Sequence, residues 1–203
     1  MPTVWGWLLL LACVVGISVL GIANVHPFLA CERPNDSDVF IIEGWVPDYV
    51  LDQGLVPFKE GHCRLIIATG GPLKVGAELA RYKTYAGLTA ARLLKMGFRD
   101  EQIVAVPHEA VDKDRTHAAA LEVGRWLEKH PDVKRANLVT RGPHARRSYV
   151  SFKRILPAGF ELGVCTVPSR EYDPKRWWAS SEGFRTVVSE AIAYAYVLVA
   201  GPR

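Results

Sequence analysis

The first 30 residues of this 203-residue chain lack Asp, Glu, Lys and Arg, so all 25 basic and 21 acidic residues lie between Cys31 and Arg203. The uncharged stretch from Val4 to Ala23 is about 20 residues long, which matches the hydrocarbon thickness of a bilayer. A basic n-region and an A-x-A-like exit, both typical of a cleaved signal peptide, are missing. Trp5 and Trp7 suit an interfacial anchor. We therefore predict an uncleaved transmembrane signal anchor over residues 1–23.

Three other interpretations of this segment stay open. They are a cleaved signal peptide, a lipid-modified Cys13 or Cys31 after Leu-Ala, and a buried core helix, although core helices seldom run this long without a polar face. Lys and Arg are absent before the apolar run and only Arg33 follows it closely, so the residues leave its membrane orientation open.

Several signatures of known chemistry are also missing. The chain has no Gly-x-Ser-x-Gly elbow, no dinucleotide-binding fingerprint and no Walker lysine, and we expect no cofactor. Of its four cysteines, Cys13 lies in the apolar run. The other three, at positions 31, 63 and 165, stand at no metal-ligand spacing, which favours small buried hydrophobes over ligands. A net charge of +4 permits attraction to anionic lipid or phosphorylated metabolites but is too small to indicate nucleic acid.

What remains is an alternation of short apolar runs with helical patterns, following a predicted linker over residues 24–37. Continuous apolar strands between helices indicate a parallel sheet covered on both faces. We predict one α/β domain over residues 38–203, with a Rossmann-like, doubly wound, mainly parallel five-stranded sheet. The predicted strands are 38–43, 64–69, 102–107, 136–140 and 162–167, and the predicted helices are 47–61, 78–96, a helix that Asp114 caps, 143–156 and 182–200.

In such sheets a ligand binds outside the carboxyl ends of the strands. One of these ends is Glu43-Gly44-Trp45, and another is Thr69-Gly70-Gly71. Gly70 and Gly71 permit close backbone approach, so their N–H groups are candidates for binding an anion. The alternative is a tight turn from strand to helix without a ligand.

The segment from Arg141 to Arg147 carries the strongest signal. It opens a helix, where free N–H groups and the positive end of the helix dipole favour an anion. Arg141, Arg146 and Arg147 add forked donors that match phosphate or carboxylate oxygens, and His144 shares a helix face with Arg147. We predict that His144 acts as general acid or base and that Glu43 orients it or serves as base. The alternative is a solvated basic face.

The loop before the predicted helix at Asp114 contributes further candidates. Arg115 and Thr116 are placed to contact a ligand, whereas Asp114 is explained by helix capping alone. His108, Glu109, Asp112 and His117 fit no standard metal-ligand spacing, so no metal site is predicted.

The chain resembles the ElyC/SanA/YdcF family of bacterial proteins over about residues 38–200. The resemblance is carried by the order of VFIIEGW, IIATGGP, KTYAGLTAARLLKMG, DRTHAAA, LVTRGPHARRS and YDPKRWWASSEG. It implies a central site that contains His144 and Arg147, with Gly70 and Gly71 in the glycine turn. Where many members have Glu-Ala and Glu-Asn, this chain has Tyr85-Ala86 and Ala118-Ala119.

The resemblance also implies a cell-envelope protein with an exported, periplasm-facing domain held at the inner membrane, connected with peptidoglycan or its lipid carrier. Two hypotheses follow for its function. The first is an enzyme that handles an anionic small molecule or lipid-linked phosphate. The second is a non-catalytic module that binds a ligand or a partner and regulates envelope assembly.

Overall fold

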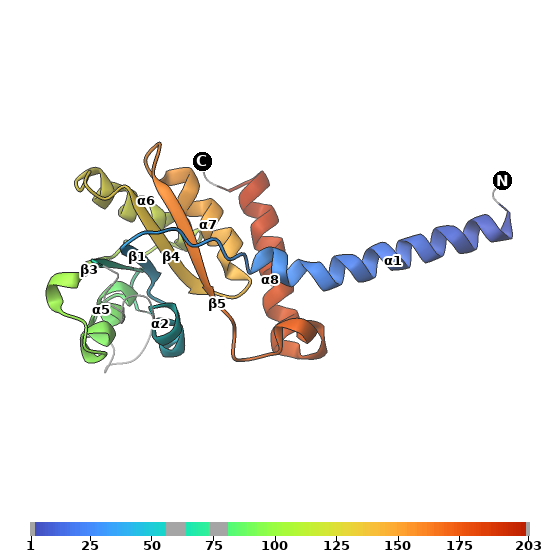
Figure 1. The fold of residues 1–203 in the computed structure, drawn as a ribbon, viewed down its shortest axis with the longest axis horizontal. Helices are drawn as coiled ribbons and strands as arrows, with labels where there is room; N and C mark the ends of the chain where they lie inside the picture. The colour runs from blue at the N-terminus through green and yellow to red at the C-terminus, as the bar shows by residue number, and fades with distance from the viewer. Residues whose placement is uncertain (1–2, 56–63, 74–80, 202–203) are drawn as a thin grey trace.

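A computed structural model of the protein describes residues 3–55, 64–73 and 81–201. It shows an α/β domain built on a five-stranded, all-parallel sheet, from which one long helix projects (Figure 1). The sheet order is β3-β2-β1-β4-β5. The chain adds β2 and β3 on one side of β1 and then returns to add β4 and β5 on its other side, so the strand order reverses between β1 and β4. The predicted fold class is confirmed. The strands are β1 (Val39–Glu43), β2 (Leu65–Thr69), β3 (Ile103–Val106), β4 (Arg135–Arg141) and β5 (Glu161–Val167).

Helices cover both faces of the sheet, which explains why the strands are apolar throughout. Phe40 and Ile42 of β1 pack on the side of α2 (Asp48–Gly54) and α5 (Tyr85–Lys95). The alternate residues of β1 pack on the other side, with α6 (Arg115–Glu128) and α7 (His144–Ile155). The remaining elements are η1 (Asp100–Gln102), η2 (Pro174–Ala179) and α8 (Ser181–Val199).

Three helix predictions need correction or trimming. The helix predicted over 78–96 begins only at Tyr85, because the Thr84 hydroxyl accepts the Gly87 N–H as a cap and Lys83 has a φ of 61°. Residues 78–80, and residues 56–61 of the helix predicted over 47–61, lie outside the described part of the chain. In α8 the predicted core residues Ala195 and Leu198 are exposed, because the domain covers only one side of this helix.

The N-terminal helix α1 (Val4–Leu29) extends beyond the predicted end at residue 23. It is long and apolar enough to cross a membrane. Its last turn packs on the domain, where Leu29 is buried with Tyr172, Trp177 and Val187 in what we call the anchor cluster. In Figure 1, α1 leaves this contact and projects away from the sheet, crosswise to α8.

The residues that follow α1, predicted as a linker, run along the edge of the sheet beside β5. Arg33 and Val164 exchange backbone hydrogen bonds of 2.9 Å, and the Thr166 hydroxyl donates to the Cys31 carbonyl over 2.5 Å. Asn35 and Asn137 exchange two further bonds, of 2.9 and 2.8 Å. These contacts tie the end of α1 to the domain instead of leaving a free tether.

Replacing Leu29 by alanine is expected to lower the free energy of unfolding of the domain by about 2–3 kcal/mol, because the side chain is fully buried in the anchor cluster. The neighbouring Phe28 is 47% exposed, so Phe28→Ala serves as the control and should cost less than ~1 kcal/mol. Thermal unfolding of the detergent-solubilised chain measures both. A loss below ~1 kcal/mol for Leu29→Ala as well would show that α1 does not pack on the domain as described.

Candidate functional site

Glu43 is a buried carboxylate at the carboxyl end of β1, next to β4. Its Oε2 atom accepts a 2.5 Å hydrogen bond from the Thr140 hydroxyl of β4. Its Oε1 atom accepts a 2.9 Å bond from Ser148 of α7 and lies 3.2 Å from His144 Nε2. Only 3% of the residue is exposed. A charge this deeply buried is retained only when it is paired and hydrogen-bonded, and here it is both.

His144 begins α7 and lies between two carboxylates. Its Nδ1 atom is 2.9 Å from Glu190 Oε1, opposite the Nε2 contact with Glu43. Arg147, one turn along α7, donates two hydrogen bonds to the Glu190 carboxylate, of 2.8 Å from Nε and 3.0 Å from Nη2. Its Nη1 atom donates to the Thr116 hydroxyl of α6 over 3.2 Å. Residues from β1, α7 and α8 thus form one chain of buried and half-buried charges, the Glu43–His144–Glu190–Arg147 network.

The network keeps its members charged despite burial. Burial alone lowers the pKa of His144, but the charges and hydrogen bonds of Glu43 and Glu190 outweigh it and raise this pKa to about 9. Burial alone raises the pKa of Glu190, yet hydrogen bonds from His144 and Arg147 bring it down to about 2. The pKa of Glu43 is also lowered, since the charge of His144 and three hydrogen bonds overcome the effect of burial. Two carboxylates therefore balance one imidazolium and one guanidinium at neutral pH.

A cavity of about 640 Å³ opens above this network at the carboxyl edge of the sheet. This is the position at which ligands bind in doubly wound folds, beside the switch point between β1 and β4. Trp45 lies on its wall with its ring edge-on to the His144 ring, the two centroids 4.8 Å apart. The structure brings seven of the predicted site residues to this cavity: Glu43, Gly70, Gly71, Arg115, Thr116, His144 and Arg147.

Two predicted arginine donors lie elsewhere. Arg146 does not line the cavity, because its guanidinium stacks on the Phe28 ring at 3.9 Å and donates to the Phe28 carbonyl of α1. Arg141 forms a 2.8 Å ion pair with Glu171. Helical spacing explains why Arg146 and Arg147 differ, since adjacent residues of a helix point about 100° apart. Of the three arginines, only Arg147 reaches the cavity.

The Gly70-Gly71 turn is explained first by packing. Gly70 has a φ of 151°, and a Cβ atom there would lie 2.7 Å from the Cβ of Tyr85. A Cβ on Gly71 would lie 2.5 Å from Cε1 of the His108 ring. Any larger residue would displace the start of α5 or the His108 wall of the cavity. The sequence pattern allowed both a tight turn and an anion cradle; these contacts support the tight turn, and the anion cradle stays a prediction.

A buried hydroxyl beside the cavity lacks a partner. Thr69 ends β2 opposite Glu43 of β1 and lines the cavity, and its Oγ1 atom has no hydrogen-bond partner among the described residues. Buried hydroxyl groups without a partner are uncommon in native proteins. Thr69 is fully buried, so this hydroxyl lies within the cavity wall and not on its accessible surface.

The mouth of the cavity carries exposed charges from the loop before α6. Asp112, Lys113 and Arg115 are exposed there. Asp114 stands at the N-cap position of α6, as predicted, but it has a φ of 56° and its side chain makes no capping bond. Within residues 3–55, 64–73 and 81–201, no three His, Cys, Asp or Glu side chains are grouped to hold a metal ion.

Glu190 is the site residue that the sequence interpretation missed. It stands 46 residues beyond His144, and helix periodicity does not indicate such a contact. One signal was present: Glu190 is the only charged residue between Arg185 and Arg203, within an otherwise apolar helix. A charge in that setting is paired more often than not. Comparison of the chain with protein-family models, with curated proteins and with solved structures gave no match.

Proposed function

We propose that this is a membrane-anchored enzyme that binds an anionic small molecule or lipid-linked phosphate in the cavity and carries out acid–base chemistry with Glu43 and His144. The buried Glu43–His144–Glu190–Arg147 network at the cavity floor carries the proposal. Replacing buried ion pairs by apolar side chains is often neutral or stabilising, so stability alone gives little reason to keep one. Coupled titratable groups with strongly shifted pKa values in a cleft are typical of functional sites.

The anionic character of the ligand is supported at the cavity mouth. Arg115 is exposed and has no ion-pair partner among the described residues, and it begins α6, whose first N–H groups receive no side-chain cap. Uncapped N–H groups and the positive dipole end of a helix favour an anion. Asp112 and Asp114 stand on the same loop, and they favour a ligand that also carries polar or cationic groups.

Proton transfer is the chemistry that the network supports best. Glu43 Oε1 and His144 Nε2 lie 3.2 Å apart, within hydrogen-bonding distance. Because the pKa of His144 is raised to about 9 by Glu43 and Glu190 against the effect of burial, this residue is protonated at neutral pH and suits a general acid. Glu190 and Arg147 hold the ring in place from the other side. Once His144 has given up its proton, its neutral ring is the base that takes a proton back, and Glu43 orients the ring and stabilises its protonated form.

The cellular setting belongs to the same proposal. The apolar helix α1 supports attachment to a membrane. The resemblance to the ElyC/SanA/YdcF family supports the bacterial inner membrane, a domain on the periplasmic side, and a substrate connected with peptidoglycan or its lipid carrier.

One observation favours the second candidate, a non-catalytic binding module that regulates envelope assembly. Both ring nitrogens of His144 contact carboxylates, and Arg147 is engaged by Glu190 and Thr116. A site so fully paired can bind a ligand without taking part in bond rearrangement. Turnover that is lost in Glu43→Gln while ligand affinity is retained would establish the enzyme. Binding without turnover by the unmodified protein would establish the module.

Ligand binding is tested by thermal unfolding of the full chain in detergent with phosphate, nucleotides, S-adenosylmethionine and prenyl phosphates. A ligand at 100 times its Kd should stabilise the protein by about 3 kcal/mol, or roughly 5–10 °C in Tm. Arg115→Ala should abolish most of this shift. Arg125→Ala, on the same helix but away from the cavity, should leave it unchanged. The absence of any shift, or an equal shift in Arg115→Ala, would refute an anion site at the cavity mouth.

A further inference from the structure

Helix α8 has two functional faces. Glu190, Ala193 and Val197 line the cavity on one of them. Phe184, Ile192 and Val199 lie on the opposite one, at helical spacings of eight and seven residues. These three side chains are 55%, 66% and 85% exposed, and Trp178 of the adjoining η2 is 48% exposed. We call these four residues the α8 stripe. An exposed apolar stripe of this length needs a partner.

The position of α1 identifies the partner. Trp177, adjacent to Trp178, donates its indole N–H to the carbonyl of Ile22 over 3.2 Å. From Val4 to Ile22 the helix is about 28 Å long at about 1.5 Å per residue, close to the hydrocarbon thickness of roughly 30 Å. A span that starts at Val4 therefore ends beside the Trp177–Trp178 pair. Trp5 and Trp7 mark the other end, so tryptophans stand at both interfaces.

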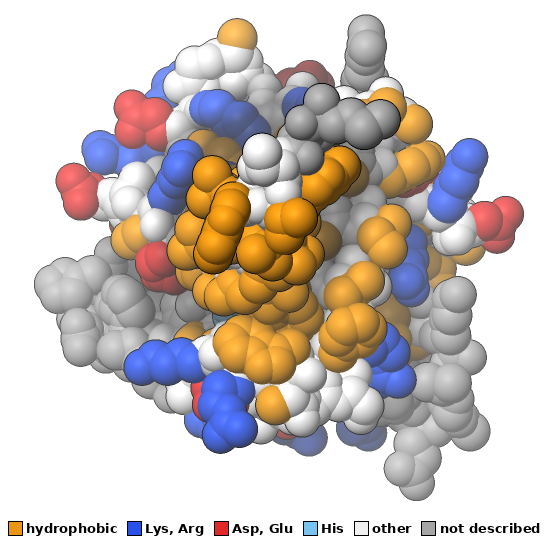
Figure 2. All heavy atoms as spheres, turned by 90° about the vertical axis from the view of Figure 1, so that its right-hand side faces the viewer, with side chains coloured by type: hydrophobic (Ala, Val, Ile, Leu, Met, Phe, Trp, Pro, Cys, Tyr) orange, Lys and Arg blue, Asp and Glu red, His pale blue; other side chains and the backbone are white. Residues whose placement is uncertain are grey.

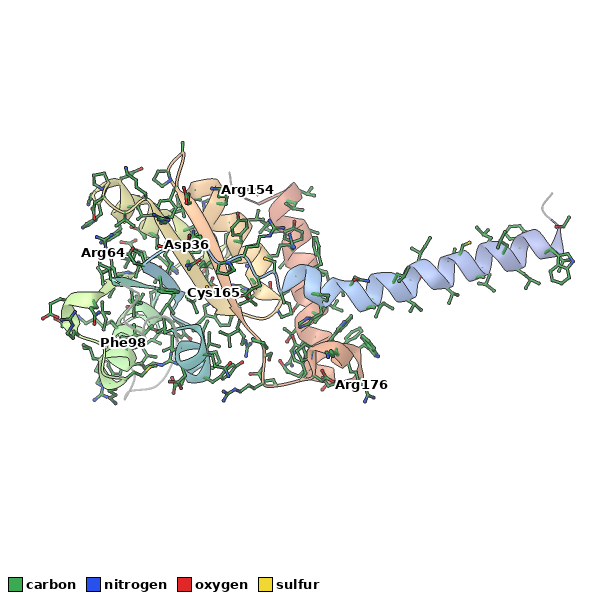
Figure 3. The ribbon with its side chains drawn as sticks, viewed as in Figure 1. Asp36, Arg64, Phe98, Arg154, Cys165 and Arg176 are labelled. Atoms are coloured by element: carbon green, nitrogen blue, oxygen red, sulfur yellow. The ribbon has the colours of Figure 1, made fainter. Side chains whose placement is uncertain are left out.

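The orientation of α8 agrees with this depth. In Figure 1 it runs crosswise to α1, so with α1 along the bilayer normal α8 lies parallel to the membrane surface. Figure 2 looks along α1 toward the domain, so the hydrophobic side chains at its centre include those of α1 seen end-on, and Lys and Arg side chains lie around them. Lys175 and Arg176 are exposed beside the start of α8, and Figure 3 shows Arg176 at the outer edge of η2. Near the C-terminal end of α8, the Arg154 guanidinium donates a hydrogen bond to the Val197 carbonyl.

We propose that the α8 stripe lies in the interfacial region of the membrane that α1 crosses, with Lys175 and Arg176 against anionic lipid headgroups. An amphipathic helix in the interface buries its apolar face about 5–10 Å into the boundary between headgroups and acyl chains. The membrane anchor and the domain then form one rigid unit on the bilayer, and the same helix holds Glu190 in the network. The inference rests on the membrane attachment in the proposed function.

The test uses the full chain in vesicles of phosphatidylcholine and phosphatidylglycerol, with an environment-sensitive NBD fluorophore on one cysteine at a time. Cys31, Cys63 and Cys165 are replaced by alanine throughout. Native Cys13 reports insertion of α1, and Ile192→Cys in a Cys13→Ala background reports the stripe. Glu101→Cys in the same background is the control, since it is exposed on η1 at the end of the domain away from α1 (Figure 1).

Spin-labelled lipids should quench the label at 192 at least about twofold more than the label at 101, because an interfacial helix places its apolar face near the upper acyl chain. Lys175→Glu with Arg176→Glu should reduce this difference in anionic vesicles. Equal quenching at 192 and 101 with a quenched Cys13 label would overturn the inference and leave the anchor intact. An unquenched Cys13 label would instead overturn the membrane attachment itself. Self-quenching at 192 that grows with protein density would replace lipid by a second copy of the chain, which also overturns the inference.

Discussion

Replacing His144 by alanine is expected to lower the free energy of unfolding by about 3–5 kcal/mol, the usual cost of removing one partner from a buried ion pair. The substitution leaves Glu43 buried, with two hydroxyl donors but no neighbouring cation. Glu190 keeps Arg147 and is less affected. In a domain of this size the expected fall in Tm is roughly 6–20 °C. Thermal unfolding of the detergent-solubilised chain measures it.

Two further variants assign this loss to the ion pair. His117→Ala removes a histidine of α6 outside the network and should change the free energy of unfolding by less than about 0.5 kcal/mol. In a Glu43→Gln background, His144→Ala should cost at least ~1 kcal/mol less than in the unmodified protein, because no buried charge is stranded. Strictly additive effects would show that Glu43 and His144 are not coupled, and the proposed acid–base pair would then be abandoned.

Stability should depend on pH in a window set by the network. The pKa of His144 in the folded protein, raised by Glu43 and Glu190 against burial, is about 9, whereas an unfolded histidine titrates near 6.5. A raised pKa means that the folded state holds the proton more tightly. Its contribution is therefore complete below about pH 6.5 and is lost as the pH rises to about 9. The expected loss over this window is about 3 kcal/mol.

The acid limb has the opposite sign. The pKa of Glu190, which burial alone would raise, is lowered to about 2 by His144 and Arg147, so its contribution is complete above about pH 4.5 and fades toward pH 2. We expect the highest Tm between about pH 4.5 and 6.5. Burial raises the pKa of Cys165 to about 12, and this thiol adds alkaline loss only above about pH 8.5, where unfolded thiols ionise.

Thermal unfolding of the full chain across pH 4–9.5 checks this window, with His144→Gln as the matched variant. Glutamine keeps a hydrogen-bond donor near Glu43 but does not titrate. The decline between pH 6.5 and 8.5 should be much shallower in this variant than in the unmodified protein. An identical decline in both proteins would assign the alkaline limb to other groups and remove His144 as the proton-holding residue.

Much of the site could be predicted from the sequence because it depends on local order. A parallel sheet brings the carboxyl ends of its strands to one edge, so the positions of Glu43, Thr69 and Thr140 follow once the strands are recognised. The spacing of His144 and Arg147 on one helix then determines their shared face. The prediction that Cys63 is a small buried hydrophobic residue concerns a position outside the described residues.

Other parts of the site depend on contacts that no local pattern encodes. Arg146 and Arg147 are equal candidates by type, but α1 packs beside one of them and α8 beside the other. Glu190 joins the network only because α8 crosses α7 at that level. The need for glycine at positions 70 and 71 comes from the close approach of Tyr85 and His108. In each case a residue from a distant segment decides the role.

The sequence by itself thus determined the apolar helix, the alternation of strands and helices, and the edge of the sheet where the site lies. Each of these follows from periodicity and from the burial of apolar side chains, which are properties of neighbouring residues. Only the tertiary structure decided which arginine enters the cavity, which carboxylate completes the His144 network, and that α1 rests on α8. These outcomes depend on the packing of helices far apart in the chain, because the geometry of that packing sets which charges come within hydrogen-bonding distance.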